Sequence, residues 1–179
     1  MQKKIILIIV GLVIIGGVFY VSSSLLKNNT ANISNIKNEL GGDNKITVFK
    51  SPTCSCCADY IKYLKKEGFD VKVENVNNML SIKEKYQVPT ELESCHTSII
   101  RATAKDEEGD LSSSPVGNYF VEGHVPIEVI KKLLTEKPAL DGIALPGMPS
   151  GAPGMSGPKT GEFKIYGISK GEITEFTTF

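Results

Sequence analysis

Three of the four cysteines in this 179-residue chain crowd into one short stretch, as Cys54, Cys56 and Cys57. The residues before them, at 46–49, are β-branched and aromatic, which predicts a strand. The residues after them, at 58–67, carry apolar side chains at helical spacing, which predicts a helix. The fold must therefore place three thiols where a strand ends and a helix begins.

The rest of the hydrophobic pattern predicts one α/β domain. We expect a second strand over 71–76, a second helix over 79–86, strands at 97–100 and 118–121, and a helix over 126–134. The resulting order is βαβαββα, with the cysteines between the first strand and the first helix, and this is the arrangement of a thioredoxin-like core. Val88-Pro89-Thr90 also looks like the proline turn that such folds carry opposite their cysteines.

Three further segments surround this core. Residues 145–158 hold four prolines and four glycines, so this Pro/Gly/Met-rich segment predicts an extended strap. Residues 163–168 and 172–176 predict a C-terminal hairpin. The polar, serine-rich stretch 101–117 predicts a flexible hairpin excursion between the last two strands of the core.

The N-terminus predicts a membrane anchor. Lys3 and Lys4 precede an uncharged run over 5–26, and a helix needs roughly 20 apolar residues to cross a bilayer. We expect residues 1–26 to be an uncleaved transmembrane helix, and the alternative is a cleaved signal segment. Both interpretations place the remainder outside the cytoplasm, because the positive charges tend to stay inside. Residues 27–44 then form a linker, and residues 45–179 form the metal-binding domain.

Charge excludes one class of partner. The chain has 20 basic and 20 acidic residues and a formal net charge of zero. No overall basic field exists to attract nucleic acid, so we expect no nucleic-acid partner.

The cysteine spacing favours a metal site. Four cysteines in an extracytoplasmic chain ordinarily suggest two disulfides, but here three crowd together and only Cys95 is distant. A helix N-terminus favours the thiolate, which is the form that binds metal. Thiolate and thioether ligands favour Cu(I), and bridging thiolates could hold more than one ion, whereas a closed Cys/His set suits Zn(II) as well. The spacing alone does not separate the two metals.

The candidate ligands come from four parts of the chain. They are Cys54, Cys56, Cys57, Cys95, His96, His124, Met148 and Met155. His96 directly follows a cysteine, and His124 begins the last predicted helix, where a local hydrogen bond is its alternative role. The two methionines lie in a strap that has no hydrophobic pattern, and their alternative role is to pack on the domain surface.

A thiol-disulfide oxidoreductase is the competing interpretation. Cys54 and Cys57 alone form a Cys-x-x-Cys pair at a helix start, with Cys54 as the attacking thiolate and Cys57 as the resolving thiol. Cys56 and Cys95 argue against this interpretation, because a simple oxidoreductase needs neither. The sequence favours a metal-binding protein over an enzyme, and an enzyme here would use thiol or copper redox chemistry. A structural zinc site and a pair of disulfides remain as further alternatives.

Several motifs together resemble a known family, the CopG-like copper-resistance-associated proteins of bacteria, long catalogued as a domain of unknown function. The motifs are FKSPTCSCC at 49–57, Val88-Pro89, Glu93-Ser94-Cys95-His96-Thr97, VEGHVP at 121–126, LPGMP at 145–149, and Pro153-Gly154-Met155. The resemblance covers the chain from about residue 46 to the C-terminus. It implies a thioredoxin-like fold, copper binding through the cysteines, and copper efflux or oxidase proteins as partners.

The chain departs from the family pattern at two places within the domain. Ser55 stands where the family commonly has glycine between the first two cysteines, which is a mild change. The stretch 101–117 replaces a tight hairpin and could alter access or a partner surface. The predicted anchor is a third departure, because relatives are often simply exported.

Overall fold

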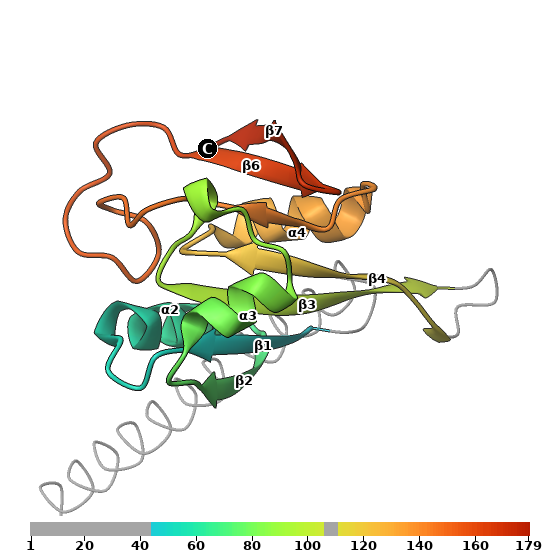
Figure 1. Cartoon of the computed structure of the whole chain (residues 1–179), viewed down its shortest axis with the longest axis horizontal. Helices are drawn as coiled ribbons and strands as arrows, with labels where there is room; N and C mark the ends of the chain where they lie inside the picture. Colours follow the sequence, from blue (N-terminus) through green and yellow to red (C-terminus); the bar gives the residue numbers. More distant parts are fainter. Residues whose placement is uncertain (1–43, 106–110) are drawn as a thin grey trace, which may run out of the picture. The chain divides into compact units, whose positions relative to one another are not determined.

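The structure is a computed structural model, and it describes residues 44–105 and 111–179 (Figure 1). Its elements are β1 (Lys45–Lys50), α2 (Ser55–Lys66), β2 (Asp70–Asn75), α3 (Met79–Lys85), the 3-10 helix η1 (Thr90–Leu92), β3 (His96–Lys105), β4 (Leu111–Glu122), α4 (Ile127–Glu136), β5 (Gly142–Ala144), β6 (Lys164–Ser169) and β7 (Glu172–Thr178). The predicted order βαβαββα is confirmed from β1 to α4, with η1 added before β3.

The strands form one mixed sheet with the order β2-β1-β3-β4-β5-β6-β7. β1 runs parallel to β2 and antiparallel to β3, and β4 runs antiparallel to β3. The register pairs Lys50 with His96 and Thr97 with Glu122. The end of β1, the start of β3 and the end of β4 therefore lie side by side at the same end of the strands, beside the N-terminus of α2.

The helices cover both faces of this sheet. Side chains of α2 and α4 form the larger buried cluster against β1, β4 and β6, including Leu64, Ile130 and Ile165. On the other face, where α3 lies in front of the sheet in Figure 1, a smaller cluster forms around Leu92 and Phe120. Successive residues of a strand point to opposite faces, so neighbouring positions of β4 serve different clusters.

The hairpin predicted for residues 101–117 is present over its described residues, and its flexibility stays a prediction. β3 and β4 extend into this stretch and pair as far as Lys105 with Leu111, and residues 106–110 lie outside the described residues. The ladder shifts register near Thr103, which pairs with Pro115. A proline lacks the backbone N–H of a regular ladder and is tolerated at such a bulge, so the extended pairing accommodates it.

The C-terminal part contains one strand that the sequence pattern did not predict. β5 has only three residues, all buried, and it lies between β4 and the predicted hairpin, which the structure shows as β6 and β7. The strap follows β5. No helix within residues 44–105 and 111–179 is long and apolar enough to cross a membrane, and the predicted anchor at 1–26 lies outside the described residues.

Candidate metal centre

The first turn of α2 presents three sulfurs together. Cys54 is the N-cap of the helix, and its sulfur accepts a hydrogen bond from the backbone N–H of Cys57 at 3.3 Å. A cysteine is an unusual N-cap residue, but its sulfur accepts a hydrogen bond from a backbone N–H that has no partner within the helix. The Cys54 and Cys57 sulfurs form a disulfide, and Cys56 is a free thiol 3.5 Å from the Cys54 sulfur.

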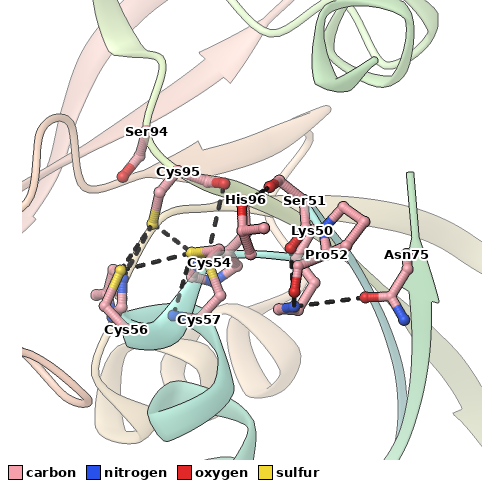
Figure 2. Close-up of a disulfide and its surroundings, with 12 residues drawn as sticks. Lys50, Ser51, Pro52, Cys54, Cys56, Cys57, Asn75, Ser94, Cys95 and His96 are labelled. Carbon is pink, nitrogen blue, oxygen red and sulfur yellow. Dashed lines mark hydrogen bonds between the residues drawn. A yellow bond between two sulfur atoms is a disulfide. The ribbon is translucent and has the colours of Figure 1, made fainter. Parts of the chain in front are cut away.

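A buried lysine shapes the turn that leads into these cysteines. The Lys50 ammonium donates to the Ser51 carbonyl at 2.8 Å and lies 3.5 Å from the Pro52 carbonyl. It also lies 3.4 Å from the side-chain oxygen of Asn75 (Figure 2). These contacts hold the loop between β1 and α2 in place.

Cys95 brings the fourth sulfur to the same place from the loop before β3. Its sulfur lies 4.0 Å from that of Cys56, and its carbonyl oxygen lies 3.8 Å from the Cys57 sulfur. The four cysteine sulfurs all lie within 4.8 Å of one another, as Figure 2 illustrates. The predicted convergence of all four cysteines is therefore present.

Both histidines contact the sulfur of Cys95. It lies 3.3 Å from Nδ1 of His96 and 3.1 Å from Nε2 of His124, so these side chains form a second group of potential metal ligands. Nδ1 of His124 lies 2.6 Å from the Pro153 carbonyl, which can only accept a hydrogen bond. Nδ1 therefore carries the proton and Nε2 keeps its lone pair toward the sulfur, as a metal ligand requires.

Burial keeps these groups uncharged. It raises the pKa of the Cys95 thiol to about 12, with a further contribution from the neighbouring Cys56. Burial also lowers the pKa of His96 well below its ordinary value, and it lowers that of His124. The Nε2 atom of His96 is buried and has no hydrogen-bond partner. Neutral imidazoles are ready to bind a metal, whereas the thiol must release a proton when a metal binds.

Tyr60 is a site residue that the sequence analysis missed. Its ring lies 4.7 Å from the His96 ring and 5.1 Å from the His124 ring, measured between centroids, and its hydroxyl donates to the Val125 carbonyl at 2.8 Å. Tyr60 lies one helical turn after Cys57 on the buried side of α2, and that spacing could have indicated it. Its ring therefore packs against both imidazoles.

A buried ion pair beside the histidines was also missed. Glu122 and Lys83 contact each other, with side-chain exposures of 0% and 6%. Burial raises the pKa of Glu122, against the opposing effect of Lys83 and of its hydrogen bonds. Glu122 stands two residues before His124, which hints at a role. Lys83 is a charged residue in α3, and nothing in its sequence context indicates burial.

The strap is tied to the candidate site at three points. The Ser94 hydroxyl donates to the Gly147 carbonyl at 2.5 Å, Pro153 contacts His124, and Gly154 lies against the backbone of Tyr60. Met148 is 55% exposed, and Met155 is half-buried against the larger core cluster. Their role as ligands stays a prediction.

Two glycines of the strap provide a matched test of this attachment. Gly147 and Gly154 both have positive φ, but only at Gly154 would a Cβ atom clash, 2.5 Å from the Tyr60 backbone nitrogen. We expect Gly147→Ala to cost about 1 kcal/mol through backbone strain and Gly154→Ala to cost about 3 kcal/mol or more, because it adds overpacking. Urea denaturation measures the free energy of unfolding of both variants, and equal costs would contradict the strap contact.

Comparison with known proteins yields a family model and two solved structures. The family model, described as a protein of unknown function, DUF411, matches residues 113–155. A structure described as copper resistance protein CopG, form 1, has 34% identity and a TM-score of 0.62, over 75% of this chain and 96% of that chain. Form 2 has 33% identity and a TM-score of 0.60, over 75% of this chain and 97% of that chain.

A search of curated proteins gives no match. The similarity to the two solved structures extends over nearly their whole length. The chain therefore belongs to the CopG-like copper-resistance family.

Proposed function

We propose that this protein binds copper as Cu(I) and serves in copper resistance by sequestering or handling the ion. The ligands in this proposal are the sulfurs of Cys54, Cys56, Cys57 and Cys95 and the imidazoles of His96 and His124, with Met148 and Met155 completing or shielding the site. The reduced form of the protein is the binding form, because a disulfide cannot supply two thiolates.

One observation carries the proposal: the Cys95 sulfur belongs to both groups of potential ligands. One group contains only sulfur, and the other adds two imidazole nitrogens. A thiolate can bridge two metal ions, so this arrangement supports the binding of more than one Cu(I). Soft sulfur ligands favour copper(I) over harder cations, and the names of the two similar structures point to copper rather than zinc.

The topology supports a thioredoxin-like core as the scaffold. β1 and β2 are parallel, β3 and β4 are antiparallel to their neighbours, and the cysteines stand at the start of the helix after β1. We further propose that residues 1–26 anchor the chain to a membrane with the domain outside the cytoplasm, and that copper efflux or oxidase proteins are its partners. The charge order of the N-terminus supports the orientation.

A Cu(I) titration tests the proposal. The full chain in mild detergent is reduced without oxygen and titrated with Cu(I) against the chelator bathocuproine disulfonate, and native mass spectrometry counts the bound ions. We expect tight binding that outcompetes the chelator, because several thiolates converge on one position. Prior alkylation with iodoacetamide should abolish the binding, and Zn(II) should not displace the bound copper. Binding that survives alkylation would refute the proposed ligands.

The disulfide favours a second candidate function, thiol-disulfide exchange. Cys54 and Cys57 are already joined, and Cys54 lies at a helix start as the attacking thiol of such proteins does. The same titration separates the candidates. Weak Cu(I) binding, together with rapid reduction of a model disulfide in a parallel sample, would favour the oxidoreductase.

A further inference from the structure

The carboxylate of Glu122 holds the segment that carries Cys95 and His96 at both of its ends. One oxygen accepts a hydrogen bond from the backbone N–H of Ser94 at 2.6 Å. The other accepts from the hydroxyl of Thr97, also at 2.6 Å. Ser94 and Thr97 directly flank the two potential ligands, so one fully buried side chain fixes the backbone on either side of them.

Lys83 of α3 completes this arrangement. Its ammonium contacts the same carboxylate and donates to the Ser94 carbonyl at 2.9 Å. The backbone N–H of Ser94 is thereby held by Glu122, and the backbone carbonyl of Ser94 is held by Lys83. The lysine also balances the charge of Glu122, which would otherwise be costly to bury.

Glu122 also connects the segment with Cys95 and His96 to His124, the third potential ligand of that group. It ends β4, and the chain then turns through Gly123 to His124. The backbone N–H of Gly123 donates to the His96 carbonyl at 3.0 Å. A Cβ at Gly123 would lie 2.5 Å from the Leu145 carbonyl oxygen, so the turn admits no side chain. The segment with Cys95 and His96 is therefore held by Glu122, and the turn that carries His124 follows directly from Glu122.

We propose that Glu122, with Lys83 balancing its charge, is a positioning residue for the metal site. Its hydrogen bonds set Cys95, His96 and His124 in place before the metal binds, so that little rearrangement opposes binding. This inference rests on the proposed Cu(I) binding. Removal of such an outer partner typically lowers metal affinity by about 10–100-fold.

Two double variants separate positioning from simple stability. Lys83→Met/Glu122→Gln and Lys83→Met/Glu122→Met both remove the buried charges and keep similar volume. Only glutamine can still accept from Ser94 and hydrogen-bond to Thr97. We expect the glutamine variant to bind Cu(I) nearly as the wild type does, and the methionine variant to bind about 10–100-fold more weakly.

The experiment uses the reduced full chain in detergent, chelator competition for affinity, circular dichroism for folding, and X-ray absorption to count sulfur neighbours of bound copper. The methionine variant should also show fewer sulfur neighbours, which a merely structural role would not produce. Thr97→Val provides a milder test if that variant does not fold, and it should weaken binding several-fold. Glu136→Gln is the control, because it removes an exposed carboxylate far from the site and should change nothing.

The two proposals fail in different ways. Wild-type protein that binds no Cu(I) would overturn the proposed function and the inference with it. Tight wild-type binding together with equal affinities in both double variants, or with an unchanged affinity in Thr97→Val, would overturn the positioning role alone.

Discussion

Cys95→Ser is expected to lower the Cu(I) affinity of the reduced protein by at least about 100-fold, beyond the usual effect of losing an outer partner. The Cys95 sulfur lies 4.0 Å from that of Cys56 and 3.1 Å from Nε2 of His124, so it joins the two groups of potential ligands. A serine hydroxyl stays protonated and is a poor ligand for a soft cation. The substitution therefore removes a ligand from both groups at once.

Cys56→Ser is the matched control for this prediction. Cys56 belongs only to the all-sulfur group, so its loss should leave the Cys95, His96 and His124 group intact. We expect a smaller decrease in affinity than for Cys95→Ser, measured by the same chelator competition. Equal decreases in the two variants, or an unchanged affinity in Cys95→Ser, would show that Cys95 does not bridge the groups.

The proton on Cys95 adds a pH dependence to the same experiment. Its pKa is raised to about 12, so the thiol is protonated throughout the neutral range and Cu(I) must displace the proton. The apparent affinity of the wild type should therefore rise with pH, by up to about tenfold per pH unit for this one proton, and fall as the pH falls. Cys95→Ser should lose that part of the slope.

The sequence allowed the order of elements and the convergence of the ligands to be predicted, because both depend on local patterns. Apolar spacing identified the buried faces of α2 and α4, and Ile61, Leu64 and Ile130 are indeed buried. In the observed strand order, β1 lies beside β3, and the end of β1 meets the start of β3 where Lys50 pairs with His96. Ligands on these segments meet because the strands do.

The residues that support the ligands could not be predicted, because their roles arise only from tertiary contacts. Lys83 is the single buried residue of α3, whereas Leu80 on the same helix is 52% exposed, the reverse of what hydrophobicity predicts. Burial of Lys83 follows from its carboxylate partner, 39 residues away. β5 was missed because three residues carry too little pattern to indicate a strand.

Oxidation to the Cys54–Cys57 disulfide is expected to reduce both the number of bound Cu(I) ions and the affinity for them. The disulfide withdraws two of the four sulfurs, which leaves Cys56 and Cys95 as the free thiols. Copper and the disulfide therefore compete for the same pair of sulfurs. We expect the oxidised protein to bind fewer Cu(I) ions, with an affinity at least about 100-fold lower than that of the reduced protein.

The double variant Cys54→Ser/Cys57→Ser is the control, because it offers the same two free thiols without a disulfide. Its affinity should match that of the oxidised protein, measured under anaerobic conditions with the same chelator. Because Cu(I) binds the reduced form preferentially, saturating copper should also raise the reduction potential of the pair, by about 30 mV for each tenfold preference. If oxidised and reduced protein bind Cu(I) equally well, Cys54 and Cys57 are not ligands, and thiol-disulfide exchange becomes the better account of the pair.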